Sequence, residues 1–206
     1  MDYKVWENLA HKYNKLWVQK YSLGPTRREV FKIISSLMEK NNNIKVLEIG
    51  CGTGQLIREV STKYKDISYF GIDVAENMIE IARKDNYGKN ITFEAISIER
   101  YKTKEMFDLI ICTHAFPYFP DKEQMMKKIS GLCNKGGRVI IANASNNSLK
   151  DKIITFLLKA TTSKAEYLSV EDMKKLFDVA LLECMSIKII REKRYMPTIA
   201  LFCLEK

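Results

Sequence analysis

Residues 46–55 of the chain read VLEIGCGTGQ. An apolar run of the kind that forms a buried strand leads directly into three glycines at alternating positions, and apolar residues with helical spacing follow. A glycine-rich turn between a strand and a helix is typical of loops that bind the phosphates of a dinucleotide, but loops of similar composition bind other cofactors. The spacing of the glycines therefore decides which cofactor the loop suits.

A dinucleotide-binding loop has the pattern G-x-G-x-x-G. Counted from either pair of neighbouring glycines, the last glycine of that pattern would stand at position 55 or 57, where the chain has Gln55 and Ile57. The observed pattern is G-x-G-x-G, with Glu48 two positions before the first glycine. The loop therefore argues against NAD as the cofactor.

Strands and helices alternate on both sides of this loop, which predicts a mostly parallel sheet with helices on both faces. Two strand-like runs at the end of the chain follow each other without a helix between them, and Pro197 marks the turn region. We therefore expect an α/β fold, a three-layer αβα sandwich whose seven-stranded, mostly parallel sheet ends in an antiparallel C-terminal hairpin. The expected strands are 44–49, 67–72, 91–95, 107–113, 138–142, 184–190 and 198–204, and the expected helices include 55–64, 75–84, 121–133 and one that begins at Ser169.

The composition argues against several classes of protein. No apolar stretch approaches the roughly 20 residues that cross a bilayer. The first residues, MDYKVWENLAHKY, are too charged for a signal peptide. We therefore expect a cytoplasmic protein without a membrane partner. Five scattered cysteines and two histidines indicate neither a disulfide framework nor a zinc cluster, so no metal is expected.

The formal net charge of +9 is compatible with a nucleic-acid partner. The lysines are spread along the whole chain, however, and the one compact basic run at 190–194 contains an acid. A solvated basic surface is therefore favoured, and a nucleic-acid partner is possible but not favoured.

Four segments together resemble the class I S-adenosylmethionine (SAM)-dependent methyltransferases. VLEIGCGTG at 46–54 is similar to the first motif of that superfamily, GID at 71–73 to the second, FDLIICTHAF at 107–116 to the fourth, and KGGRVIIA at 135–142 to the segment that enters the fifth strand. The resemblance covers roughly residues 30–205, including the terminal hairpin. It implies SAM as the cofactor and says little about the methyl acceptor.

SAM ends in a zwitterionic amino-acid group, which glycines let the backbone approach closely. The amides at the start of the next helix suit its carboxylate, and Glu48 either faces its ammonium or buttresses the loop. Asp73 offers two acceptor oxygens to the ribose hydroxyls, and the alternative role of an N-cap for the helix at 75–84 is compatible with this. The resemblance implies the cofactor-binding set Tyr13, Glu48, Gly50, Cys51, Gly52, Gly54, Asp73, Val74, Met78, Ser97, Ile98, Thr113 and His114.

The adenine contacts depart from the pattern of the family. Ser97 stands where the family usually has an acid that binds the adenine amino group. Ser97 or the backbone of Ile98 is expected to touch the adenine, with Val74 and Met78 flanking it. A plain core position is an equal alternative for Met78. Glu99 is interpreted as a surface glutamate, and the less favoured alternative is that it substitutes for the missing acid.

The residues after the fourth strand are expected at the centre of methyl transfer, because ligands of open α/β sheets bind beyond the carboxyl ends of the strands. Thr113 and His114 should line the methionine part of SAM, and Phe116 and Tyr118 the substrate pocket. His114 is the candidate catalytic base. A packing or hydrogen-bonding role beside the cofactor is an equally good interpretation of this histidine.

A single domain over 1–206 is expected to have four parts: an N-terminal helical lid (1–28), a SAM-binding core (29–142), a lid or substrate insertion (143–168), and a C-terminal helix with the hairpin (169–206). Tyr13 resembles the tyrosine of an A-x-x-Y element that closes over the SAM carboxylate, and it equally fits a core-facing stripe of the first helix. Arg27 is interpreted as a helix-surface arginine, with an anion contact as the less favoured alternative.

The expected reaction is in-line displacement of the SAM methyl group by a small-molecule acceptor, which mainly requires alignment and exclusion of water. A tRNA, rRNA or other nucleic-acid methyltransferase is one alternative. Against it, the Asn/Asp-Pro-Pro-Tyr signature is missing and THAF stands in its place. A SAM-binding protein without catalysis is the other alternative, which a filled pocket behind His114 and Tyr118 would favour. The protein is expected to be a monomer or a homodimer.

Overall fold

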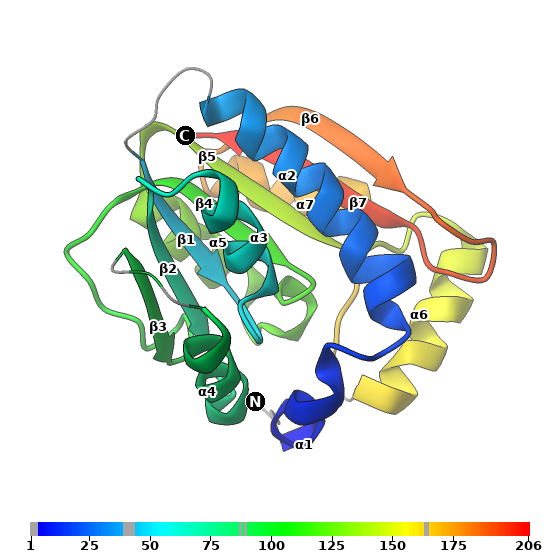
Figure 1. Ribbon diagram of the computed structural model, residues 1–206. Coiled ribbons are helices and arrows are strands. Elements are labelled where there is room, and N and C mark those ends of the chain that lie inside the picture. The colour runs from blue at the N-terminus through cyan, green and yellow to red at the C-terminus, as the bar shows by residue number, and fades with distance from the viewer. Residues whose placement is uncertain (1–3, 39–43, 87, 89, 163–164) are drawn as a thin grey trace.

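A seven-stranded sheet organises the computed structural model, which describes residues 4–38, 44–86, 88, 90–162 and 165–206 (Figure 1). The strand order is β3-β2-β1-β4-β5-β7-β6, and β7 runs antiparallel to both of its neighbours whereas the other pairings are parallel. The predicted sheet and its C-terminal hairpin are therefore confirmed. The strands are β1 (Lys45–Ile49), β2 (Ser68–Asp73), β3 (Ile91–Ala95), β4 (Phe107–Thr113), β5 (Cys133–Ala144), β6 (Glu183–Ile190) and β7 (Ile199–Glu205).

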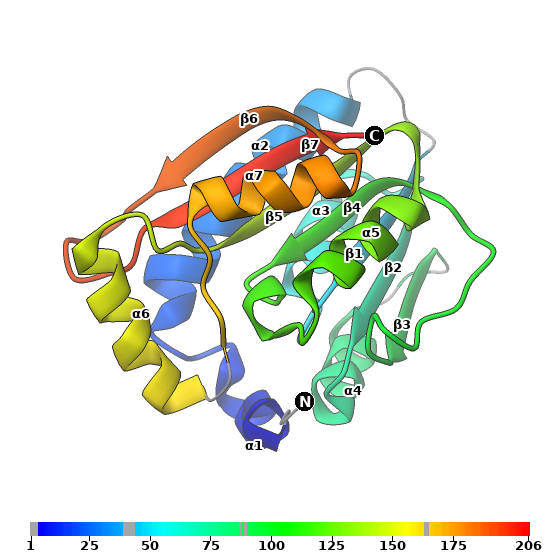
Figure 2. The same cartoon turned by 180° about the vertical axis from the view of Figure 1, so that it is seen from behind.

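Helices cover both faces of the sheet, as Figures 1 and 2 show from opposite sides. On one face lie α2 (Gly24–Met38), α3 (Gln55–Lys63) and α4 (Glu76–Asp85), and on the other lie α5 (Lys122–Leu132) and α7 (Val170–Val179). Each helix buries one apolar stripe, as α2 does with Val30, Ile34 and Met38. The three layers confirm the predicted αβα sandwich.

The core is divided into one apolar cluster on each side of the sheet. Successive side chains of a strand point to opposite faces, so a central strand contributes to both clusters. In β4, Leu109 and Ile111 belong to the cluster under α2 and α3, and Ile110 and Cys112 belong to the cluster under α5 and α7. Burial on both faces explains why the central strands are continuous apolar runs rather than alternating patterns.

One predicted boundary, the start of α7, is confirmed, and another, the start of β5, is wrong. Ser169 is the N-cap of α7, where its hydroxyl oxygen accepts a hydrogen bond from the Asp172 amide at 3.1 Å, as its spacing predicts. By contrast, β5 begins at Cys133 rather than at 138. Its pairing with β4 shifts register between Phe107 and Leu109, because the glycines at 136 and 137 form an irregular start of the strand.

Further helices gather at the carboxyl ends of the parallel strands. They are α1 (Lys4–Tyr13), the π-helix η1 (Gln19–Leu23), the 3-10 helix η2 (Phe116–Tyr118) and α6 (Leu149–Thr162). In Figure 1, α1 and α6 lie beyond the sheet at this end. Within the described part of the chain, no helix combines the length and apolar character needed to span a bilayer.

Candidate functional site

A cavity of about 500 Å³ lies at the carboxyl ends of the parallel strands. Its lining comes from the ends of β1, β2, β4 and β5, from α1 and η1, from α6, and from the connection between β6 and β7. Small-molecule sites typically have volumes of about 300–1,000 Å³. The cavity is therefore the candidate site, at the position where open α/β sheets bind ligands.

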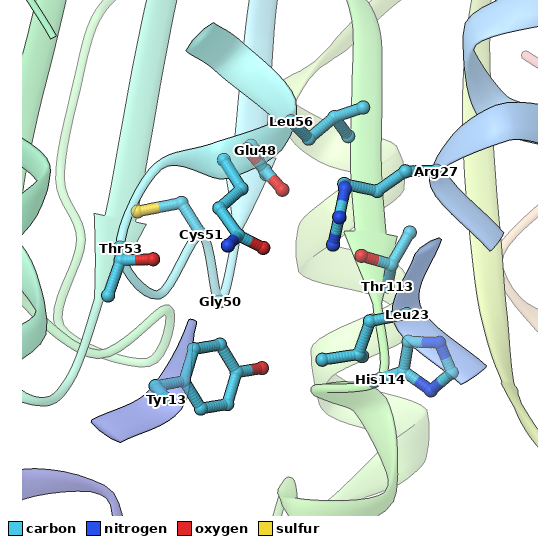
Figure 3. Close-up of a pocket in the computed structure, with 11 residues that line it drawn as sticks. Tyr13, Leu23, Arg27, Glu48, Gly50, Cys51, Thr53, Leu56, Thr113 and His114 are labelled. Carbon is cyan, nitrogen blue, oxygen red and sulfur yellow. The ribbon is translucent and has the colours of Figure 1, made fainter. Parts of the chain in front are cut away.

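Most of the predicted site residues meet at this cavity. A second, smaller cavity of about 40 Å³ adjoins it behind the glycine loop, and Glu48 and Cys51 line that one instead (Figure 3). Gly54 and Phe116 line neither cavity. The residues around the large cavity include Tyr13, Gly50, Gly52, Asp73, Val74, Met78, Ser97, Ile98, Thr113, His114 and Tyr118.

The loop after β1 depends on glycine at each of its three positions. Gly50, Gly52 and Gly54 have φ angles of 72°, 53° and 69°, in the left-handed region that other residues rarely adopt. At Gly50 an added Cβ would lie 2.3 Å from the Cβ of Ala115. Gly54 is the N-cap of α3 and packs against Phe93, so it turns the chain into that helix rather than lining the cavity.

Asp73 is held by the backbone on both sides of the loop. One carboxylate oxygen accepts a hydrogen bond from the Gly52 amide and the other from the Ala75 amide, each at 2.9 Å. Burial raises the pKa of Asp73, and these amides offset part of that effect. The N-cap of α4 is Ala75, so the alternative that Asp73 caps this helix is wrong.

The amides at the start of α4 are capped by Glu7 from α1. Its two carboxylate oxygens accept hydrogen bonds from the amides of Glu76 at 2.8 Å and Asn77 at 2.9 Å. A carboxylate at a helix N-terminus is also favoured by the helix dipole. This contact fastens α1 to α4 beside the cavity, and nothing in the local sequence around residue 76 indicates it.

Glu48 is a buried carboxylate with one open oxygen. The Ile57 amide donates a hydrogen bond to the carboxylate, but Oε2 has no hydrogen-bond partner among the described residues. Burial raises the pKa of Glu48 to about 8, and the charge of Arg27 only partly opposes this. The side chain therefore buttresses the start of α3 and leaves one oxygen available in the small cavity, and the predicted contact with the ammonium stays a prediction.

The raised pKa of Glu48 predicts a pH dependence of stability. Between the ordinary pKa of 4.5 and the folded value of about 8, the folded protein holds a proton that the unfolded chain has lost. We therefore expect the free energy of unfolding of the cofactor-free protein to fall as pH rises through this window, by on the order of 4 kcal/mol from this group. Urea unfolding at pH 5 and pH 8 measures the change. Glu48→Gln should show a smaller decrease, and equal decreases in the two proteins would contradict the assignment.

Arg27 is a site residue, for which the sequence favoured a surface position over an anion contact. Its side chain is 17% exposed, so its interpretation as a helix-surface arginine is wrong. Nε donates to Glu59 at 3.0 Å and Nη1 donates to Gln19 at 2.9 Å. Figure 3 shows the guanidinium on the same side of the small cavity as Glu48. Residue order alone does not reveal that the first turn of α2 meets the end of β1.

His114 is fixed by its backbone and by its ring. It has a φ of 60°, and its amide donates to the Ala142 carbonyl at 2.7 Å. The Nε2 atom lies 3.0 Å from the Oγ1 atom of buried Thr26, a residue to which the sequence assigned no role. Burial, and then the nearby charge of Arg27, lowers the pKa of His114 to about 4, so the ring is neutral at physiological pH.

Aromatic side chains connect α1 to the far side of the cavity. Trp6 packs edge-on against Tyr13, with ring centroids 6.3 Å apart, and against Tyr118 at 5.4 Å. Just beyond α1, Asn14 accepts a hydrogen bond from the Thr53 hydroxyl of the glycine loop at 2.6 Å. Tyr13 both lines the cavities and packs beside Met78, so its two proposed roles are not exclusive.

The adenine end of the site differs in part from expectation. Ser97 and Ile98 line the cavity, as does Met78, which is only 2% exposed and also belongs to an apolar cluster. Glu99 lines the cavity too, and its Oε2 is buried without a hydrogen-bond partner in the described structure. The interpretation of Glu99 as a surface residue is therefore wrong.

Phe116 lies in the apolar core rather than in the substrate pocket. It is 1% exposed and packs against Phe119 with ring centroids 5.4 Å apart. The 3-10 turn of η2 directs this side chain inward, whereas Pro117 and Tyr118 face the cavity. The predicted pocket role of Phe116 therefore needs correction.

A family model described as a methyltransferase domain matches residues 40–200 of the chain. The chain belongs to this methyltransferase family. Membership confirms the predicted resemblance to class I SAM-dependent methyltransferases and SAM as the cofactor of the domain. It leaves the roles of individual residues to be argued from their geometry.

Two curated relatives illustrate the similarity of this methyltransferase domain. It is 34% identical over 89 residues to a malonyl-[acyl-carrier protein] O-methyltransferase of Bacillus anthracis, covering 43% of this chain and 33% of the relative. It is 32% identical to an uncharacterized methyltransferase of Anoxybacillus flavithermus, covering 68% of this chain and 66% of the relative. The chain spans 33%, 37% and 64% of the length of three curated relatives that it matches.

Solved structures share the fold of the domain. The magnesium protoporphyrin IX methyltransferase of Synechocystis PCC 6803 with bound SAM superposes with a TM-score of 0.69 at 17% identity. This match covers 92% of the present chain and 84% of that protein. At this level of identity the comparison supports the architecture and not a shared substrate.

Proposed function

We propose that the methyltransferase domain transfers the methyl group of SAM to a small-molecule acceptor bound in the large cavity. The observation that carries this proposal is the continuity of the cavity from Asp73 and Ser97, past His114, to a separate apolar region. We name that region the acceptor half. It is lined by Trp17, Val18, Asn143, Ile154, Leu158, Tyr167, Tyr195, Met196 and Pro197.

The residues at the other end fit SAM. The glycine loop leaves room for the amino-acid group, because Gly52 lacks a side chain beneath Tyr13. The open Oε2 of Glu48 suits the ammonium, and Arg27 suits the carboxylate. Asp73 is placed for the ribose hydroxyls.

The adenine is proposed to lie at the remaining part of the cofactor end. Val74 and Met78 would flank the base, and Ser97 and Ile98 would contact its edge. Thr113 lines both cavities, between the amino-acid end and the acceptor half. These assignments use every predicted cofactor residue except Cys51 and Gly54, which support the loop from behind.

The protein's own contribution to methyl transfer would be alignment and exclusion of water. When bound, SAM supplies a methyl group on a positively charged sulfur, which the lone pair of an acceptor can displace in line. The aromatic contacts of Trp6 with Tyr13 and Tyr118 support α1 as a cover over the reacting centre. His114, between the two ends, is placed to orient the acceptor or to take up its proton.

The geometry favours this function over the two alternatives. Nucleic-acid substrates are held through their phosphates by Lys and Arg, and no described residue that lines the large cavity is of either type. A filled pocket behind His114 and Tyr118 would favour a SAM-binding protein without catalysis. The cavity instead continues beyond these two residues, which supports a catalytic role. Names of relatives such as ubiquinone biosynthesis O-methyltransferase also support a small acceptor. A cytoplasmic location and a monomeric or homodimeric state remain predictions.

Calorimetry and transfer assays test the proposal together. We expect SAM and its demethylated product to bind with micromolar dissociation constants and NAD not to bind. With labelled SAM, methyl transfer is expected to metabolite pools and not to tRNA. Binding of NAD, or failure to bind SAM, would contradict the proposed cofactor site, and labelling of tRNA alone would contradict the proposed acceptor class.

A further inference from the structure

No described residue that lines the acceptor half of the cavity carries a positive charge. The chain has 34 lysines and arginines, yet none of the described residues around the large cavity is one of them. The guanidinium of Arg27 lines the small cavity instead, where it is assigned to the carboxylate of SAM. Burying an ionised carboxylate or phosphate without a cation is strongly unfavourable. The described residues therefore offer an anionic acceptor no counter-charge.

Asn143 presents an unused hydrogen-bond acceptor to the cavity. It stands near the end of β5 and is 2% exposed. Its Nδ2 donates to the Ala144 carbonyl at 3.2 Å, and because a carbonyl can only accept, this contact fixes which way the amide points. The other atom, Oδ1, is buried and has no partner among the described residues. A ligand that donates a hydrogen bond would satisfy it.

The hydrogen bonds of Thr26 determine the tautomer of His114. The Thr26 hydroxyl has one proton, which it donates to the Ser22 carbonyl at 2.9 Å. Its oxygen must therefore accept at the 3.0 Å contact with His114, so the proton on the ring is at Nε2. Nδ1 then carries a lone pair, and none of the described residues donates to it. The neutral ring of His114 thus offers the cavity a second hydrogen-bond acceptor, its Nδ1 atom.

These observations define the kind of molecule that fits the acceptor half. We propose that the acceptor is an uncharged, largely apolar molecule that is methylated on an O–H or N–H group, with His114 Nδ1 receiving the proton and Asn143 Oδ1 accepting a second hydrogen bond. A phenol or an aromatic amine with a neighbouring donor has this chemistry. The inference rests on the proposed function, since it names the acceptor class for the same cavity.

The proposed transfer step is a displacement at the methyl carbon of SAM. A lone pair of the acceptor oxygen or nitrogen forms the bond to the methyl carbon, and the carbon–sulfur bond breaks with its electron pair returning to sulfur. The acceptor atom becomes positively charged, so its proton becomes strongly acidic and passes to Nδ1 of His114. A weakly basic imidazole is sufficient for such a proton, and the low pKa of His114 lets it release the proton to water afterwards.

Matched pairs of acceptors test the charge requirement. Phenols and anilines are compared with benzoates of the same ring substitution, and a malonyl thioester is added as a further carboxylate. On the protein saturated with S-adenosylhomocysteine, the uncharged members should bind at least about tenfold more tightly than their carboxylates. Methyl transfer from labelled SAM should follow the same order. Tighter binding or faster methylation of the carboxylates would overturn the inference, whereas failure to bind S-adenosylhomocysteine would contradict the proposed function itself.

Variants test the two hydrogen-bond acceptors separately. In Thr26→Val, ¹⁵N NMR of the His114 ring should show loss of the single Nε2–H tautomer, and the transfer rate should fall about tenfold with unchanged affinity for S-adenosylhomocysteine. Thr26→Ser should restore both. Thr62→Val is the matched control, because the Thr62 hydroxyl makes the same contact to the carbonyl four residues earlier, at 2.7 Å, with no histidine beside it. An unchanged His114 spectrum in Thr26→Val would contradict the role of Thr26.

Asn143→Leu addresses the second contact. We expect it to weaken binding of a ring with two neighbouring hydroxyls about tenfold, and to leave binding of the single-hydroxyl analogue nearly unchanged. Equal effects on the two ligands would overturn the assignment of Asn143 to a second donor group.

Discussion

Asp73→Ala is expected to raise the dissociation constant for S-adenosylhomocysteine at least about 100-fold. The carboxylate accepts hydrogen bonds from the amides of Gly52 and Ala75, and it is placed to accept those of the ribose hydroxyls as well. Hydrogen bonds to a charged group contribute about 1.5–3 kcal/mol each, and a tenfold change in affinity corresponds to about 1.4 kcal/mol. The loss of contacts to the ligand and the loosening of the loop therefore act in the same direction. Isothermal titration calorimetry measures the affinity.

Two further variants separate these effects. Asp73→Asn keeps one acceptor oxygen and should bind with intermediate affinity, while Asp66→Ala removes an exposed aspartate outside the site and should bind normally. Circular dichroism and thermal unfolding establish whether each variant is folded. Unchanged affinity in folded Asp73→Ala would show that the ribose assignment is wrong.

Gly50→Ala is expected to destabilise the fold and to abolish cofactor binding together. The new Cβ would lie 2.3 Å from the Cβ of Ala115, and the φ of 72° would be strained for alanine. Overpacking costs about 1–3 kcal/mol and a left-handed backbone about 1–2 kcal/mol, so a loss of roughly 2–5 kcal/mol in the free energy of unfolding is expected. Urea unfolding measures the loss, and calorimetry with S-adenosylhomocysteine reports the binding.

Gly131→Ala is the matched control for this substitution. Gly131 lies in α5, and no other atom lies within 4 Å of the position of its added Cβ. Alanine in a helix is favoured over glycine by up to about 1 kcal/mol, so this variant should be as stable as the parent or more stable, with normal binding. If the two variants lost stability equally, the close approach of Gly50 and Ala115 would not be the cause.

Much of the fold follows from local patterns in the sequence. Continuous apolar runs such as LIIC in β4 identify strands that are buried on both faces. Two strand-like runs around Pro197 without a helix between them identify the hairpin. The glycine loop and the position of Asp73 can also be predicted from the sequence, because glycine spacing and a carboxylate at a strand end indicate the local backbone geometry. These features depend on neighbours in the chain.

The missed site residues depend on contacts between distant segments. Thr26 meets His114 across 88 positions, and Glu7 meets Glu76 across 69. No local pattern distinguishes such a threonine or glutamate from one on the surface. The prediction for Phe116 was wrong for a related reason. In a short 3-10 turn, neighbouring residues point in different directions, so a shift of one position decides whether a side chain faces the core or the cavity. Packing between layers sets these outcomes.

The contact between Glu7 and the first turn of α4 has a consequence for how motion at the site can be observed. α1 cannot leave the cavity without releasing the amide protons of Glu76 and Asn77, which no other described residue accepts in place of Glu7. Their exchange with deuterated solvent therefore records how often this end of the molecule opens. A ligand that holds α1 in place will slow the exchange of these two protons, so two backbone positions outside the cavity report its occupancy.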